Sequence, residues 1–167
     1  MRWGMRMARK DEADRVLRGA RWGLMAAIVM TILMLIDLAI SRAPSPRTFP
    51  VLIVGRLLGR SGGGGLYLLA FTAQLIYGAL MGVVFAFLAR PMTLAKGVGI
   101  GLMLWFLFEI EFIPWLGWGD FGFERGGAAL FYTLVMHVIY GSVLGWLGAR
   151  DDGAHAAHFD DLGQLVA

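Results

Sequence analysis

The chain has 167 residues, of which 58% are hydrophobic and only 16% are charged, and its mean hydropathy is +0.67. Soluble domains carry about 25% charged residues, so this composition excludes an ordinary soluble domain and predicts a membrane protein. The absence of cysteine excludes disulfide bonds, thiolate metal sites and thiol catalysis. The formal net charge of +3 is unevenly distributed, because basic residues concentrate near the N-terminus.

Residues 1–18 form a basic arm directly before an apolar run. A basic cluster next to a span sets the orientation of the helix, so we expect a cytoplasmic arm and no nucleic-acid partner. The apolar run from Gly23 to Ile40 is longer than the core of a cleavable signal peptide, which has about 7–15 residues, and this predicts a retained signal anchor. The basic residues of positions 1–21, which include the arm and the start of the first span, are Arg2, Arg6, Arg9, Lys10, Arg15, Arg18 and Arg21.

Four apolar stretches, about residues 19–40, 66–89, 97–116 and 127–148, are long enough to cross a bilayer. They predict an all-α, polytopic membrane protein whose transmembrane domain covers residues 19–148 as two helical hairpins. Basic residues are more numerous on the side that holds both termini, so we expect both termini in the cytoplasm and the chain in the inner (plasma) membrane.

The connection between the first two spans contains a shorter apolar segment, residues 48–60, which is too short to span. Arg56 and Arg60 stand beside its aliphatic residues. Three placements stay open from the sequence: in the membrane interface, re-entering the outer leaflet, or folded as an ordinary packed loop.

The second and fourth spans resemble each other. Residues 74–82 match residues 137–145, with a Tyr-Gly pair at the same place in each. The match suggests two hairpins related by an axis along the membrane normal, a parallel 2+2 repeat, and chance similarity between apolar helices is the alternative.

Each span also carries two glycines four residues apart. Such glycines let two helix backbones approach closely within lipid, so we expect tight packing toward the cytoplasmic ends of the helices. The pairs are Gly19/Gly23, Gly78/Gly82, Gly97/Gly101 and Gly141/Gly145.

Polar side chains fall in the other half of the predicted bundle, where a charged group costs about 2.5–3.5 kcal/mol on insertion scales. We expect Glu109 to pair with His137, either as a structural hydrogen bond or as part of a proton relay. A position at the membrane interface is the favoured explanation for Asp37 and an equal alternative for Glu111, and packing is favoured for the two tyrosines. The candidate cluster consists of Asp37, Gln74, Tyr77, Glu109, Glu111, His137 and Tyr140.

No motif predicts an enzyme, a metal site or a cofactor. A single histidine within the spans cannot supply both axial ligands of a membrane b haem, and the carboxylates match no known metal-site spacing. The acidic segment 149–167 predicts a solvated cytoplasmic tail. His155 and His158, at i and i+3 within it, offer adventitious metal binding as the lesser alternative.

Short motifs between residues 27 and 148 carry a family resemblance. They are Ala27-Ile28-Val29-Met30-Thr31, Leu57-Leu58-Gly59, Gly101-Leu102-Met103-Leu104-Trp105, Pro114-Trp115-Leu116-Gly117-Trp118-Gly119 and His137-Val138-Ile139-Tyr140-Gly141. With them the chain resembles a group of uncharacterised small four-helix membrane proteins of bacteria and archaea. Some similar proteins are associated with terminal oxidase genes, so the resemblance implies an accessory subunit of a respiratory complex. Gln74 stands where similar proteins often have histidine.

Two functional hypotheses follow. The first is a non-catalytic membrane subunit that packs, in the lipid bilayer, against other subunits of a larger respiratory or energy-transducing complex. The alternative is a small homo-oligomeric transporter or channel that moves protons or a cation past the intramembrane acidic and histidine cluster.

Overall fold

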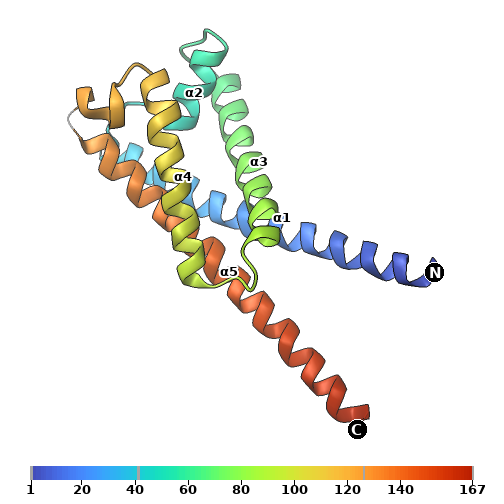
Figure 1. Ribbon diagram of the computed structural model, residues 1–167. Coiled ribbons are helices and arrows are strands. Elements are labelled where there is room, and N and C mark those ends of the chain that lie inside the picture. Colours follow the sequence, from blue (N-terminus) through green and yellow to red (C-terminus); the bar gives the residue numbers. More distant parts are fainter. Residues whose placement is uncertain (1, 41, 126, 167) are drawn as a thin grey trace.

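The computed structural model describes the backbone of residues 2–40, 42–125 and 127–166, and the side chains of residues 11–40, 42–124 and 127–154. Within these residues the chain is all-helical, with five α-helices, one 3₁₀-helix and no strand (Figure 1). The helices are α1 (Arg2–Ala39), α2 (Phe49–Leu57), α3 (Gly64–Leu88), α4 (Leu94–Trp115), η1 (Asp120–Arg125) and α5 (Ala128–Val166).

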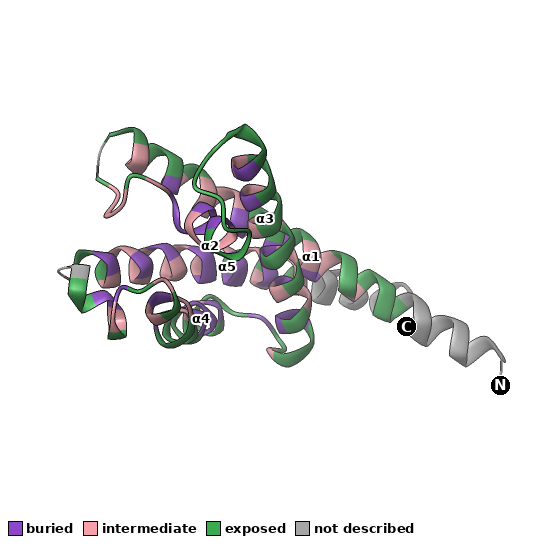
Figure 2. Cartoon of the chain, turned by 90° about the horizontal axis from the view of Figure 1, so that it is seen from above, coloured by how far each residue is buried: buried purple, intermediate pink, exposed green. Residues whose placement is uncertain are grey.

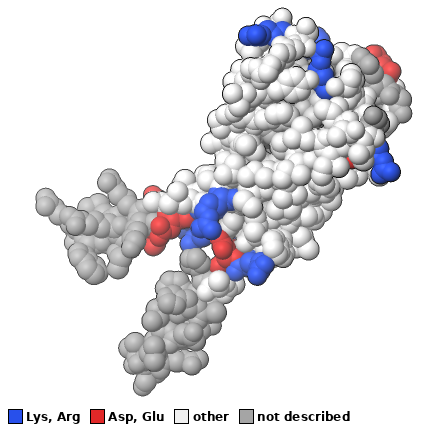
Figure 3. Space-filling view, turned by 180° about the vertical axis from the view of Figure 1, so that it is seen from behind, with Lys and Arg blue, Asp and Glu red and all other residues white. Residues whose placement is uncertain are grey.

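Four helical segments have the length and composition to cross a membrane: Asp11–Ala39, Gly64–Leu88, Leu94–Trp115 and Ala128–Ala154. Only 22–39% of each apolar window is buried inside the protein, so most of this apolar surface is left for lipid. Figure 3 shows basic side chains at the two ends of the molecule with an uncharged band between them. The predicted all-α, four-span membrane protein is confirmed, whereas the 2+2 repeat stays a prediction.

The spanning helices pair as two crossed hairpins. α1 packs along α3, α4 packs along α5, and α1 also packs against α5 (Figures 1 and 2). The helices therefore contact one another in the order α3–α1–α5–α4. The helices at the two ends of this series, α3 and α4, share no comparable contact. We call the end of the bundle with the Arg90–Lys96 connection the connection end, and the opposite end the α2 end.

The glycine pairs hold each hairpin together. Gly23 of α1 faces Gly78 and Gly82 of α3, where an added Cβ would come within 2.8 Å of the Gly82 backbone. Gly97 of α4 faces Gly141 and Gly145 of α5 in the same way. The structure therefore uses the glycine faces inside the chain, between helices that are joined in sequence.

The first and last spanning helices, α1 and α5, extend beyond the predicted spans. α1 begins at Arg2 and α5 continues to Val166, so the arm and the tail extend the spanning helices. Asp151 accepts a 2.7 Å hydrogen bond from Trp22 Nε1, and Asp152 accepts one of 2.8 Å from the Met92 N–H. The first part of the predicted solvated tail is thus tied to the connection end.

Two sets of predicted features lie outside the described side chains. The first set is Arg2, Arg6, Arg9 and Lys10 in the arm, and the second set is His155 and His158 in the tail.

Segment 48–60 folds as the short helix α2 with an irregular end. Pro50 lies in its first turn, where the missing N–H costs no hydrogen bond. Val51 packs with Leu66 and Ala70 of α3, and Phe49 packs against Trp118 with ring centroids 5.3 Å apart. α2 therefore rests on the bundle and covers one end of its interior.

Candidate functional site

A cavity of about 290 Å³ occupies the α2 half of the bundle. All five α-helices contribute to its wall, and it lies at the side where α3 and α4 do not meet. Tyr77, which lines it from α3, is 51% exposed, and Leu107, which lines it from α4, is 43% exposed. Because α3 and α4 face lipid, this opening leads sideways into the bilayer.

The cavity gathers five of the seven polar residues that the sequence singled out. They are Gln74, Tyr77, Glu111, His137 and Tyr140. Asp37 and Glu109 do not line it. Asp37 lies at the end of α1, where its carbonyl oxygen accepts the backbone N–H of Arg42 at 2.8 Å and of Ala43 at 3.2 Å.

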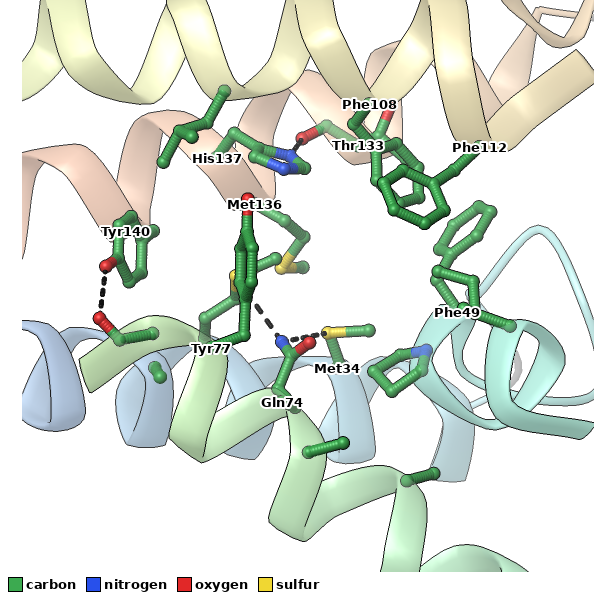
Figure 4. A pocket seen from close by; sticks show the side chains of 18 of the residues that line it. Met34, Phe49, Gln74, Tyr77, Phe108, Phe112, Thr133, Met136, His137 and Tyr140 are labelled. Atoms are coloured by element: carbon green, nitrogen blue, oxygen red, sulfur yellow. Dashed lines mark hydrogen bonds between the residues drawn. The ribbon is translucent and has the colours of Figure 1, made fainter. Parts of the chain in front are cut away.

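Gln74 and Tyr77 are on α3, three residues apart and therefore on one face of the helix. The Gln74 amide nitrogen contacts only two sulfur atoms, Met30 Sδ at 3.8 Å and Met34 Sδ at 4.0 Å (Figure 4). Sulfur is a weak acceptor, so this amide keeps donor capacity for a ligand. In Figure 4 the ring of Tyr77 points from α3 across the cavity toward the α5 side, where His137 lies.

His137 has a defined tautomer. Its Nδ1 lies 2.8 Å from the carbonyl oxygen of Thr133, which can only accept, so Nδ1 carries a proton and donates it. When the ring is neutral, Nε2 is left as an acceptor. The ring packs against Phe108 of α4 with centroids 5.4 Å apart, which fixes its position in the wall.

The expected pair of Glu109 and His137 is wrong. Glu109 is fully buried and its Oε1 accepts a hydrogen bond from the Thr133 hydroxyl, while His137 bonds to the Thr133 carbonyl. The α4 helix turns Glu109 toward the α5 backbone and away from the cavity. The second oxygen, Oε2, lies buried without a hydrogen bond of ordinary geometry. Thr133 is the polar residue that the sequence reasoning missed.

The Thr133 hydroxyl also lies close to two carbonyl oxygens of its own helix. Its Oγ1 lies 2.9 Å from the carbonyl oxygen of Ala129 and 3.0 Å from that of Leu130, in addition to the Glu109 contact. One hydroxyl has one proton to donate, so only one of these acceptors is served at a time. A threonine within an apolar helix commonly bonds back to its own carbonyls, which is why its sequence position carried no signal.

Tyr140 closes the inner end of the cavity. Its hydroxyl donates to the carbonyl oxygen of Gly78 at 2.8 Å, which joins α5 to α3 (Figure 4). Leu104 and Ala27 pack beside it in the buried core. Below this layer the glycine contacts leave no room, so the cavity does not continue toward the connection end.

Glu111 is the carboxylate of the cavity. It is an exposed residue of α4, and the rings of Phe108 and Phe112, which line the same cavity, stack at a centroid distance of 5.5 Å. No hydrogen bond or ion pair joins Glu111 to any of the described side chains. An acid within apolar surroundings is costly unless it meets water, a proton or a cation.

Arg56 reaches over the α2 end of the cavity. Its Nη1 donates to the Leu116 carbonyl oxygen at 3.4 Å, and its guanidinium lies 5.5 Å from the Trp115 ring. Both contacts are weak by geometry. They join α2 to the end of α4, so the segment whose placement stayed open from the sequence is held at the α2 end of the bundle.

The groups that line the cavity can bind a ligand or relay a proton. Among the described residues, no three histidine or acidic side chains gather as a metal site there. The cavity offers one carboxylate, one imidazole acceptor, one amide, three phenols and one threonine hydroxyl on an otherwise apolar wall. These are the groups of a binding site for a ligand that is largely hydrophobic.

Comparison with known proteins gives a family and nothing more specific. One family model, described as a family of unknown function (DUF6789), matches residues 13–158. No curated protein and no solved structure matches the chain.

Proposed function

Since the chain belongs to DUF6789, a family of unknown function, its own residues must carry any assignment, and we propose that it moves protons through the membrane by way of the cavity between α3 and α4. The observation that supports this proposal is that one intramembrane cavity is lined both by Glu111, a carboxylate without a hydrogen bond or ion pair to a described side chain, and by the His137 imidazole. Ionisable groups at such depth are costly and mark ion or substrate pathways in membrane proteins.

A transport cycle needs the cavity to open at its other end. The Tyr140–Gly78 hydrogen bond and the packing beside it close that end in this structure. Passage therefore requires α3 and α5 to separate at this contact, while the side between α3 and α4 closes. A chain of this size completes a permeation path more readily as a cyclic homo-oligomer, so a second copy is the expected partner.

A non-catalytic subunit of a larger respiratory or energy-transducing complex is the second candidate. The short connections, which leave no separate domain, and the association of similar proteins with terminal oxidase genes support it. The glycine faces do not support it, because all four pairs are buried between the chain's own helices. Partners in this case would be other membrane proteins that cover the lipid-facing sides.

The remaining features of the proposal concern location and chemistry. We place both termini in the cytoplasm of the inner membrane, with the connection end inside, on the distribution of basic residues. The protein is not an enzyme in this proposal, and it needs neither a cofactor nor a resident metal.

The test is cation flux in reconstituted liposomes. Protein in vesicles that contain a pH-sensitive dye is challenged with an acid pulse in the presence of valinomycin and potassium. We expect proton flux that is lost in Glu111→Gln and kept in Glu124→Gln, which removes an exposed carboxylate on η1 outside the cavity. Equal flux in the two variants, or none in the native chain, would refute the proposal.

Purification in mild detergent separates the two candidates. Recovery of the chain alone or as a small homo-oligomer favours transport. Recovery in a large assembly of other membrane proteins, identified by mass spectrometry, favours the subunit.

A further inference from the structure

The cavity's own wall restricts what kind of cation it can hold. We propose that it binds a hydrophobic organic cation, such as a quaternary amine or a phosphonium, which enters sideways from the lipid between α3 and α4 and places its charge beside Glu111. This inference goes beyond the proposed proton transport and concerns the same cavity, and binding itself does not require transport.

The carboxylate sets the sign of the ligand's charge. Glu111 lines the cavity without a hydrogen bond or ion pair to any described side chain, and Arg56, which does not line the cavity, bonds instead to the Leu116 carbonyl oxygen. His137 donates its Nδ1 proton to a backbone carbonyl and so presents an acceptor when neutral. The cavity thus combines one negative charge with acceptor atoms, which complements a cation.

The aromatic wall sets the kind of cation. Phe49 and Phe108 meet edge to face at 5.5 Å, and Phe112 stacks on Phe108. Tyr77 and Tyr132 add two further rings from α3 and α5. A cation over such ring faces is attracted by their quadrupoles, more strongly where water is excluded, and this is how proteins recognise quaternary ammonium groups.

A bare metal ion fits this wall poorly. Hard cations such as Ca²⁺ take about 6–8 oxygen ligands, whereas Glu111 is the one carboxylate that lines the cavity. Within the described side chains no group of three potential acidic or histidine ligands exists. An organic cation spreads its charge over its substituents and needs far fewer ligands.

The size and the opening agree with an organic ligand. The cavity of about 290 Å³ is near the lower end of small-molecule sites, roughly 300–1,000 Å³. Its lateral side is formed by exposed Tyr77 and Leu107. A ligand with an apolar tail can leave that tail in lipid while its charged head occupies the cavity.

The experiment measures binding without transport. The purified full chain, in nanodiscs of zwitterionic lipid, is titrated by calorimetry with benzyltrimethylammonium and with its neutral isostere neopentylbenzene, in which carbon replaces the charged nitrogen. We expect saturable binding of the cation and none of the neutral molecule. Empty nanodiscs give the partitioning background for both.

Three variants locate the site. Glu111→Gln should weaken binding of the cation about tenfold, Glu111→Asp, which keeps the charge, should restore most of the affinity, and Glu124→Gln should bind like the native chain. Matched size-exclusion profiles verify that each variant is folded. Equal binding by Glu111→Gln, equal binding of neopentylbenzene, or no binding by the native chain would overturn the inference.

The outcome is separable from that of the flux assay. Cation binding that depends on Glu111, without proton flux, leaves the ligand class standing and removes transport. Proton flux that depends on Glu111, without cation binding, does the reverse.

Discussion

Replacing Gly97 by alanine tests whether close backbone contact holds α4 to α5. An alanine Cβ at this position would lie 2.6 Å from the Gly145 backbone nitrogen and would also overlap the Gly141 carbonyl oxygen. Nonbonded carbon atoms pack at about 3.5–4.0 Å, and neither obstructing group is a side chain that can rotate away. The helices must therefore separate by about 1 Å, and overpacking of this kind costs about 1–3 kcal/mol.

Gly99 provides the matched control on the same helix. A Cβ there meets nothing within 4 Å. Alanine is preferred over glycine in a helix by about 1 kcal/mol, and this gain is common to both substitutions. The difference between Gly97→Ala and Gly99→Ala therefore isolates the packing cost, about 1–3 kcal/mol in disfavour of Gly97→Ala.

The assay is thermal unfolding in detergent, followed by loss of the monodisperse size-exclusion peak after heating. We expect a clearly lower midpoint for Gly97→Ala and a native or higher midpoint for Gly99→Ala. If the two variants melt together, the helices are not in backbone contact at Gly97, and the glycine argument for this hairpin fails.

Three further substitutions probe individual hydrogen bonds. Thr133→Val leaves the buried Glu109 without its donor and should destabilise the bundle by about 1–3 kcal/mol, seen as a lower melting midpoint; an unchanged midpoint would show that the carboxyl group finds another partner. Tyr140→Phe removes the bond to the Gly78 carbonyl and should lower the free energy of unfolding by about 1 kcal/mol. It should also open the inner end of the cavity, so that a membrane-soluble spin label can enter there. Asp152→Ala frees the Met92 N–H of the α3–α4 connection, so this amide should exchange hydrogen for deuterium faster than in the native chain.

The sequence predicted the spans well because hydropathy over about 20 residues is a strong signal. It also placed paired glycines in every span, but it could not say which pairs meet, since any two such faces can pack. The structure joins them within hairpins: Gly23 with Gly82, and Gly97 with Gly145.

The polar residues were harder to assign from the sequence. Depth alone suggested Glu109 as the partner of His137, but depth does not tell which side of a helix faces which neighbour. Glu109 and Glu111 are two residues apart, about 200° around the helix, so they point to different surroundings: one meets Thr133 and the other lines the cavity. Helix rotation depends on tertiary packing, which no local pattern in this chain specified.

The segment before α3 was undetermined for a related reason. A stretch of nine residues is too short to be recognised as a span and too apolar to be recognised as a surface helix. Its position follows from contacts with distant parts of the chain, Phe49 with Trp118 and Arg56 with Trp115. Such long-range contacts are invisible in the sequence of the segment itself.

The pairing of neighbouring helices also fixes an order of events during biosynthesis. α1 and α3 carry complementary glycine faces, so this hairpin can close in the membrane while the second half of the chain is still being translated. The contact between α1 and α5, and with it the cavity, forms only after the last span has been inserted. A chain truncated before Ala128 would therefore hold a paired first hairpin with no enclosed cavity, and it would expose α1's unpaired side to membrane quality control.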